Sequence, residues 1–192
     1  VLAPEDQLRK PGSCGVPAPG VSIKIFNDDG KEILEPEVPG ELYAKSVAVF
    51  DTYYKSHDQY LEDHRDGYQT VGDIAYIDDE GYYFICDRKR DMIITGGVNV
   101  YPAEIENILD DHINVAEVAV FGIPDEEWGE TVCAAIVPKR GIIESDVIDF
   151  ARNRLSGPKV PKRIFFYPEL PKTGSGKVLK QNLREQVLEE IY

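Results

Sequence analysis

The stretch Ile74-Ala75-Tyr76-Ile77-Asp78-Asp79-Glu80-Gly81-Tyr82-Tyr83-Phe84-Ile85 determines the structure of the first half of the chain. Two apolar runs flank a turn of acidic residues and glycine, which predicts an antiparallel β-hairpin. Upstream, residues 21–25 alternate with period two, residues 27–30 supply another turn, and residues 40–44 begin a further strand. We therefore expect a β-rich lobe over residues 1–87.

The pattern changes beyond the run of alternating charges from Asp87 to Asp91, which by itself is typical of a solvated loop. Strands are expected over residues 115–121, 131–137 and 164–167. Helices are expected over residues 102–112, from an N-cap at Ser145, and over residues 178–191. The fold class is therefore α+β: the β-rich lobe is followed, over residues 88–192, by a small α+β domain with a short central sheet.

Composition limits the classes of protein to which the chain can belong. Its 192 residues are 42% hydrophobic, enough for one or two globular domains with cores of their own. A formal net charge of −14 argues against non-specific binding of nucleic acid or anionic membranes, since both need a cationic surface. No apolar run approaches the roughly 20 residues of a membrane span, so we expect a soluble, cytoplasmic protein.

Cysteine and histidine do not form a metal-binding pattern. Cys14, Cys86 and Cys133 are odd in number and widely spaced, which is typical of reduced thiols and not of a disulfide framework or a zinc site. The three histidines are equally scattered, and no pair has helical ligand spacing together with a third donor. We expect no metal ligands in these residues.

A glycine-bracketed lysine near the end of the chain is the first candidate for chemistry. The run Leu170-Pro171-Lys172-Thr173-Gly174-Ser175-Gly176-Lys177 presents Lys177 just before an amphipathic helix, an arrangement that usually serves to contact an anion. It is not a phosphate-binding P-loop, because that motif needs Gly at Pro171 and Ser or Thr at Val178. The alternative is an ordinary exposed lysine at the start of a helix.

Three further motifs precede this loop in a fixed order: residues 67–73 (Gly-Tyr-Gln-Thr-Val-Gly-Asp), residues 87–91 (Asp-Arg-Lys-Arg-Asp) and residues 95–106, which begin Thr-Gly-Gly-Val-Asn-Val-Tyr-Pro. Together the four motifs resemble the adenylate-forming enzymes: acyl-CoA and aryl-CoA synthetases, the adenylation domains of peptide synthetases, and firefly-type luciferases. The resemblance covers nearly the whole chain. The sequence of residues 92–102 is similar to that of the acyl-CoA synthetases in particular.

The resemblance implies that ATP activates a carboxylic acid as an acyl-adenylate. Lys177 would be catalytic, because a mobile ammonium can approach both the substrate carboxylate and the α-phosphate and offset charge in the transition state. Asp73 would accept the ribose hydroxyl protons, and Arg88 would contact the ribose and phosphate region. The alternatives are an aspartate of a strand-end turn and a surface arginine.

The resemblance also implies a second step, transfer of the acyl group to CoA after the C-terminal domain rotates about a hinge at Arg90. Gly97 would line the tunnel for the pantetheine arm, although a glycine pair is also an ordinary turn. Trp128 would lie near CoA or else anchor a core. The cationic cluster of Lys159, Lys162 and Arg163 would flank the CoA nucleotide or else be a solubilising loop.

We therefore expect the C-terminal fragment of an ATP-dependent acyl-CoA ligase for a fatty or aryl acid, inactive by itself. Its cofactors would be ATP, Mg²⁺ and CoA, with the Mg²⁺ ligand in the upstream part, because the family's phosphate loop and its Tyr-Gly-x-Thr-Glu motif do not occur in these residues. Two alternatives stay open: an adenylation domain that loads a carrier-protein thiol, and a non-catalytic nucleotide- or CoA-binding module.

Overall fold

A computed structural model describes residues 1–49, 52 and 54–191 of the chain. The chain divides into two compact units, Val1–Arg90 and Asp91–Tyr192, and the division lies within the charged run Asp87 to Asp91. Each unit is described by itself. None of the helices in the described residues has the length and apolar character needed to cross a membrane.

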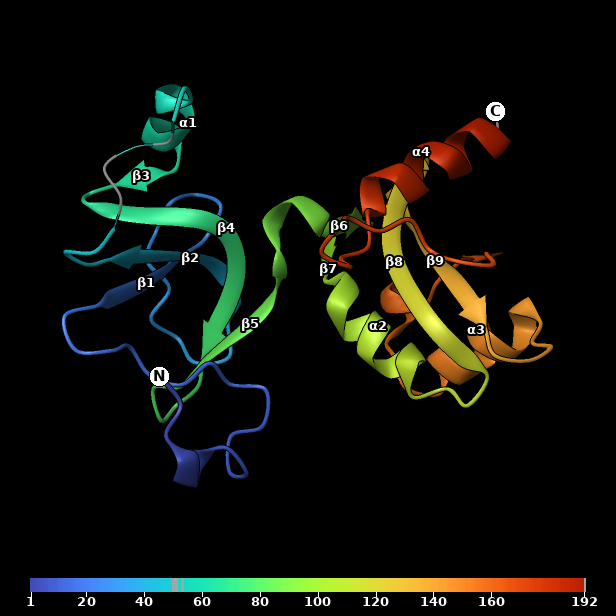
Figure 1. Ribbon diagram of the computed structural model, residues 1–192, viewed down its shortest axis with the longest axis horizontal. Helices are drawn as coiled ribbons and strands as arrows, with labels where there is room; N and C mark the ends of the chain where they lie inside the picture. Colours follow the sequence, from blue (N-terminus) through green and yellow to red (C-terminus); the bar gives the residue numbers. More distant parts are fainter. Residues whose placement is uncertain (50–51, 53, 192) are drawn as a thin grey trace. The chain divides into compact units, whose positions relative to one another are not determined.

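The first unit is built on an antiparallel sheet (Figure 1). Its strands are β1 (Ser22–Phe26), β2 (Gly40–Lys45), β3 (His64–Arg65), β4 (Tyr68–Ile77) and β5 (Tyr83–Arg88). The order is β1-β2-β4-β3, and β5 also pairs with β4. The β4–β5 pairing confirms the expected hairpin. A short 3₁₀ turn, η1 (Pro4–Asp6), and one helix, α1 (His57–Glu62), were not expected from the sequence.

Side chains from β1, β2 and β4 form the core of this unit. Ile25, Phe26, Tyr43 and Ile74 are all buried, and the rings of Phe26 and Tyr43 meet edge to face at 5.2 Å. The Arg65 guanidinium covers both rings. An arginine over aromatic faces keeps its charge near solvent while its planar group packs on the rings, so it closes one end of the core.

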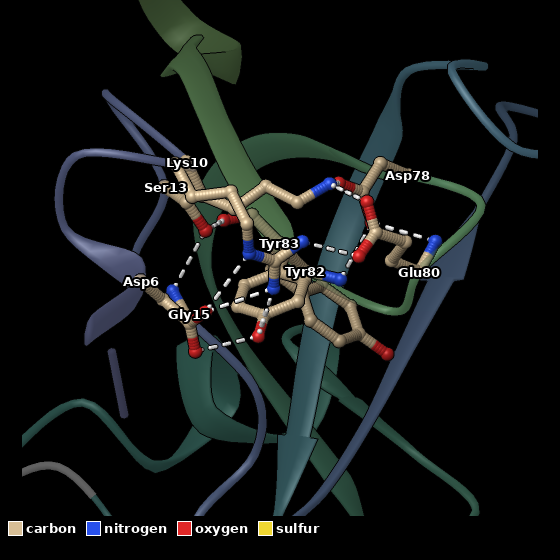
Figure 2. Close-up of polar contacts among 9 residues, drawn as sticks. Asp6, Lys10, Ser13, Gly15, Asp78, Glu80, Tyr82 and Tyr83 are labelled. Carbon is tan, nitrogen blue, oxygen red and sulfur yellow. Dashed lines mark hydrogen bonds and ion pairs between the residues drawn. The ribbon is translucent and has the colours of Figure 1, made fainter. Parts of the chain in front are cut away.

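A polar cluster holds the N-terminal segment on the β4–β5 turn (Figure 2). Lys10 Nζ pairs with Asp78 Oδ2 at 2.6 Å and Glu80 Oε1 at 2.7 Å. Asp78 in turn accepts the N–H groups of Glu80 and Tyr82, which closes the turn. Arg9 joins Asp6, Glu80 and the Tyr82 hydroxyl, and further hydrogen bonds link residues 13–15 to Tyr83. The segment before β1 is therefore fastened to the end of the hairpin.

The second unit is an α+β domain. It begins at the end of η2 (Lys89–Asp91) and contains β6 (Ile93–Thr95), β7 (Val98–Val100), α2 (Pro102–Asp110), β8 (Val115–Asp125), β9 (Gly129–Pro138), α3 (Glu144–Arg152), η3 (Gly157–Lys159), β10 (Arg163–Phe166) and α4 (Lys180–Ile191). Its sheet has the order β10-β9-β6-β7, with β8 paired to β9. Only β10 runs parallel to its neighbour among the described pairings.

Alternation along β8 and β9 gives this unit two cores. Val120, Val132, Ala134 and Ile136 face α2 and α3, which bury Ile105, Leu109, Val147 and Ala151. Residues of the opposite parity, including Phe121, Cys133 and Ala135, face α4, which buries Leu183 and Val187. Figure 1 shows the consequence, with α2 and α3 on one face of the β8–β9 ribbon and α4 on the other. A strand covered on both faces is apolar throughout.

The starts of two helices and the presence of two short strands differ from the sequence-based expectation. Helix α3 begins at Glu144 after Ile143, so Ser145 lies inside the first turn and is not the N-cap; the Asp146 carboxylate accepts the Ile143 N–H. Helix α4 begins at Lys180 and not at Val178, because Val178 pairs with Lys172 in an isolated bridge. The short strands β6 and β7 were missed, since three residues give too little alternation to recognise.

Candidate functional site

Asp73 and Arg88 lie opposite each other on β4 and β5. Arg88 Nε and Asp73 Oδ1 are 2.9 Å apart, and Arg88 Nη1 donates to the Val71 carbonyl at 3.1 Å. Because residue 73 is paired with residue 88 in the ladder, the two side chains leave the sheet on the same face. Both are partly exposed, so carboxylate and guanidinium stand side by side at the surface of the first unit.

A local distortion of β4 prepares this pair. Gly72 has φ 78°, and its N–H is accepted by the Thr70 hydroxyl at 3.0 Å. The β4–β5 register shifts between Ile74 and Ala75. The left-handed Gly72 directly precedes Asp73, and the bulge bends the strand directly after it, so both local irregularities flank this side chain. A second cation, not expected from the sequence, lies nearby: Lys89 Nζ donates to Glu41 Oε2 at 2.8 Å, and this hydrogen bond raises the pKa of Lys89.

The lysine loop of the second unit is a tight hairpin closed by Thr173. The Thr173 N–H donates to the Lys177 carbonyl at 2.8 Å, and the Lys177 N–H donates to Thr173 Oγ1 at 3.1 Å. Gly176, at φ 86°, donates its N–H to the Thr173 carbonyl. Thr173 was not singled out from the sequence, although a Thr four residues before the lysine is the residue type that forms such turns.

Lys177 differs from the lysines on either side of it. Lys172 pairs with Glu117 at 2.7 Å and Lys180 pairs with Glu106 at 2.8 Å. The Lys177 ammonium is exposed and has no hydrogen-bond or ion-pair partner among residues 1–49, 52 and 54–191. It lies on the loop three residues before α4 begins, and an anion could be bound there without displacing an existing partner.

Gly97 lies in the turn between β6 and β7, with φ 76°, next to Gly96 at φ 57°. A Cβ at Gly97 would meet no atom within 4 Å, whereas one at Gly96 would approach Trp128 Cε3 to 2.8 Å. The Gly96 N–H also donates to the Trp128 carbonyl at 2.8 Å. Trp128 is 52% exposed, so it covers the turn and is not the core anchor that the sequence left open.

The expected cationic cluster separates into two parts. Lys159 Nζ is engaged by both carboxylate oxygens of Glu104 at 2.7 Å. Lys162 and Arg163 are exposed at the start of β10. Lys162 also lines a hollow of about 370 Å³ together with Arg152 and Ile148. Two cations beside an apolar floor would suit an anionic ligand with a flat apolar part.

The larger of the two hollows described here, about 990 Å³, has the opposite character. Its lining includes Glu117, Glu169, Glu189 and Glu190. Lys172 is its cation, and that ammonium is already paired with Glu117. An acidic hollow does not suit a nucleotide or CoA.

Within residues 1–49, 52 and 54–191, no group of three or more His, Cys, Asp or Glu side chains could hold a metal ion. A magnesium site built from three or more such side chains is therefore absent from the part of the chain that the structure describes.

These features define a class of protein. A hairpin with an Asp–Arg pair precedes an α+β domain with a glycine turn and a free lysine on a loop, in the order seen in adenylate-forming enzymes. The chain belongs to this family: residues 1–54 match the family described as AMP-binding enzyme, and residues 104–177 match the AMP-binding enzyme C-terminal domain.

Individual relatives are CoA ligases for different acids. The chain is 41% identical to a long-chain-fatty-acid–CoA ligase of Bacillus subtilis, over 95% of this chain and 33% of that protein. It is 39% identical to an indoleacetate–CoA ligase of Aromatoleum aromaticum, over 100% of this chain and 38% of that protein. The chain thus spans about a third of the length of these relatives.

A solved structure agrees with the fold. The o-succinylbenzoate CoA synthetase of Bacillus subtilis, in complex with its acyl-adenylate intermediate, superposes with a TM-score of 0.88 and is 35% identical, over 97% of this chain and 37% of that one. Another structure of that synthetase contains ATP and a magnesium ion. The agreement confirms the α+β fold expected from the sequence.

Proposed function

We propose that this chain is the C-terminal part of an ATP-dependent ligase that converts a carboxylic acid first to an acyl-adenylate and then to a CoA thioester. The observation that carries the proposal is the partner-free Lys177 on a loop closed by Thr173, in a chain of the AMP-binding family. The relatives named above are CoA ligases, which supports CoA as the acceptor.

In the first step, a carboxylate oxygen would attack the α-phosphorus of ATP and pyrophosphate would leave. Lys177 would offset the negative charge that the two anions bring together, more strongly in the transition state than before it. Asp73 would accept protons from the ribose hydroxyls with the carboxylate oxygen that does not contact Arg88. Arg88 would fix the orientation of Asp73 and contact the ribose and phosphate region.

In the second step, the sulfur of CoA would attack the acyl carbonyl and AMP would leave. A side chain at position 97 would project into the open space beside the turn. Because Gly97 has no side chain, that space would stay free for the pantetheine arm. Lys162 and Arg163 would contact the phosphates of CoA, whereas Lys159 would have to leave Glu104 to do so. Arg90 would be the hinge between the two steps.

The acid is not determined by these residues, since relatives with similar identity act on fatty acids, indoleacetate and succinylbenzoate according to their names. The first experiment is to express the protein of the complete reading frame and screen acids from these classes with ATP and CoA. Pyrophosphate release and thioester yield are measured separately. Release of pyrophosphate with no thioester, followed by acylation of a carrier protein, would establish the carrier-loading alternative.

Two substitutions test the roles of the residues. Lys177→Ala should lower pyrophosphate release by at least about 100-fold, whereas Lys172→Ala, which removes a paired lysine from the same loop, should leave it within about twofold. Gly97→Leu should spare pyrophosphate release and lower thioester formation. Gly97→Ala is its control, because it imposes the same strain at positive φ with little bulk. Pyrophosphate release by Lys177→Ala at the parent rate would refute the role given to that lysine.

A further inference from the structure

The turn that carries Gly97 has little structure of its own to hold it. Strands β6 and β7 have three residues each, and they pair only from Ile93↔Val100 to Thr95↔Val98. Both residues at the tip of the turn are glycines with positive φ. A two-stranded ribbon of this length is unstable in water, so the position of the turn must be set by contacts from outside it.

Residues 128–130 supply those contacts. The Gly96 N–H donates to the Trp128 carbonyl at 2.8 Å, and Thr95 pairs with Gly129 in the one register position that joins β6 to β9 among the described residues. The Ile94 N–H donates to Glu130 Oε2 at 2.9 Å. Of these three contacts, the hydrogen bond to Glu130 is the one made by a side chain.

The other oxygen of Glu130 reaches α4. Glu130 Oε1 lies 3.3 Å from Arg184 Nη2, and the Glu130 side chain is half-buried. Gly122 makes room for this carboxylate, since a Cβ there would lie 3.0 Å from Glu130 Cδ. Glu130 therefore joins the strand leading to Gly97 with the helix that follows the Lys177 loop.

We propose that Glu130 is a positioning residue that fixes the Gly96–Gly97 turn through the Ile94 N–H, with Arg184 orienting its carboxylate. The inference rests on the proposed function, because the turn is assigned there to the pantetheine arm. Glu130 acts on the thioester-forming step through the backbone and touches neither substrate nor reacting atoms.

The chain contains a matched control for this arrangement. Glu106 Oε1 accepts the Val120 N–H at 2.7 Å and lies 2.8 Å from Lys180 Nζ, which is also on α4. Glu106 is as exposed as Glu130. Both glutamates thus join a strand N–H to a cation of the same helix, but only Glu130 holds the glycine turn.

The first test follows amide hydrogen exchange in the 192-residue chain. Glu130→Ala should speed exchange at Ile94 and Gly96 by at least about tenfold, because the Ile94 N–H loses its side-chain acceptor and the turn opens more often. Glu106→Ala should speed exchange at Val120 and leave Ile94 and Gly96 at the parent rate. Unchanged exchange at Ile94 and Gly96 in Glu130→Ala, or equal acceleration there by Glu106→Ala, would overturn the proposal.

The second test measures the two half-reactions in the protein of the complete reading frame. Glu130→Ala should lower thioester formation from preformed acyl-adenylate by about 10- to 100-fold, the cost of a small misplacement, and leave pyrophosphate release within about twofold. Glu106→Ala should change neither. Equal loss of both half-reactions in Glu130→Ala would mean a merely structural role and would overturn the proposal.

Two milder variants keep the test decisive if Glu130→Ala does not fold. Glu130→Gln retains an oxygen for the Ile94 N–H and loses the ion pair, and Arg184→Met removes the cation and keeps an apolar stem. Both variants should lower thioester formation less than Glu130→Ala does and leave pyrophosphate release unchanged. If both variants lost pyrophosphate release by the same factor as thioester formation, the proposal would be overturned. A parent protein that makes neither adenylate nor thioester would refute the proposed function, whereas the exchange measurement would still decide the contact itself.

Discussion

Lys177 can act on an anion because its ammonium is not committed elsewhere. An ion pair at a protein surface is worth about 0–1 kcal/mol, so a lysine already paired can still change partner at small cost. The larger advantage of Lys177 is geometric: Thr173 bonds both the N–H and the carbonyl of Lys177, while the side chain is exposed. A fixed base and a free tip suit a residue that must approach a charge that develops during the reaction.

Gln69 allows a prediction about stability. The residue is 6% exposed, and neither its amide oxygen nor its amide nitrogen has a hydrogen-bond partner. An unpaired buried polar group is unfavourable, so Gln69→Leu should raise the free energy of unfolding of the chain by about 1 kcal/mol. Urea denaturation followed by circular dichroism measures this. Gln7→Leu, at an exposed position, should change it by less than about 0.5 kcal/mol; a destabilised Gln69→Leu protein would show that the amide is satisfied in solution.

Cys133 allows a second prediction at this scale. Burial raises the pKa of its thiol to about 12. At pH 8, roughly one molecule in ten thousand would carry the thiolate, which is the form that reacts with alkylating reagents. Iodoacetamide should therefore label exposed Cys14 and leave Cys133 unmodified in the folded chain, as read by peptide mass spectrometry. Both should be labelled in urea, and rapid labelling of Cys133 without denaturant would contradict its burial.

At the scale of elements, the β4–β5 hairpin joins a candidate binding pair to a structural anchor. Asp73 and Arg88 lie at its open end, and Asp78 to Tyr82 form its turn. The Lys10–Asp78 pair at the turn is nearly buried, with the two side chains 13% and 7% exposed. The segment before β1 therefore restrains the hairpin at the end opposite to Asp73.

This polar cluster predicts a pH dependence of stability. Hydrogen bonds from Tyr82 and Arg9 lower the pKa of Asp6, and those from Lys10 and Arg9 lower the pKa of Glu80. For Asp78, burial opposes the shift, but the hydrogen bonds from Lys10 and from the N–H groups of Tyr82 and Glu80 together lower its pKa. A carboxyl with a lowered folded pKa binds protons more readily when unfolded. Its contribution is therefore present above the unfolded pKa of about 4 and is lost as the pH falls through the folded value.

The thermal unfolding temperature of the chain should accordingly fall as the pH drops from about 5 to about 3. In Lys10→Met the unfolding temperature should fall less than in the parent, because the hydrogen bonds from Lys10 that lower the pKa of Asp78 and Glu80 are lost. Lys31→Met, at an exposed turn of the same unit, should retain it. Differential scanning fluorimetry across this range measures all three proteins, and parallel curves for Lys10→Met and the parent would rule out the cluster as the origin of the fall.

At the scale of the whole molecule, the second unit has apolar cores of its own. Its two apolar clusters are formed entirely by residues between Ile93 and Leu188. We therefore expect residues 91–192, expressed alone, to unfold in one cooperative thermal transition and to retain exchange protection at Val120 and Ala134. Circular dichroism and hydrogen exchange measure this. A chain without a cooperative transition would show that the unit depends on residues 1–90.

The sequence by itself determined the class of fold, the hairpin at residues 74–85 and the family. Alternating apolar residues specify which faces are buried, and the motifs are contiguous runs, so both are readable without coordinates. It could not give the start of α3 or of α4, because a cap depends on which side chain reaches which backbone group. Strands β6 and β7 were equally out of reach, since three residues each give too little alternation to recognise, and the contact of β6 with β9 is made through Thr95 and Gly129, which are 34 residues apart.

The candidate site shows the same limit. Asp73, Arg88, Gly97 and Lys177 were recognisable because each lies in a motif of fixed spacing. Thr173, which closes the Lys177 loop, is local and of a residue type that forms such turns, but the more distant partners were decided only by the tertiary structure: Trp128 and Glu130 for the turn, and Glu104 for Lys159. The physical reason is that a long-range hydrogen bond or ion pair leaves no periodicity in the sequence, because it is made by residues that only the packed strands and helices bring within 3–4 Å of each other.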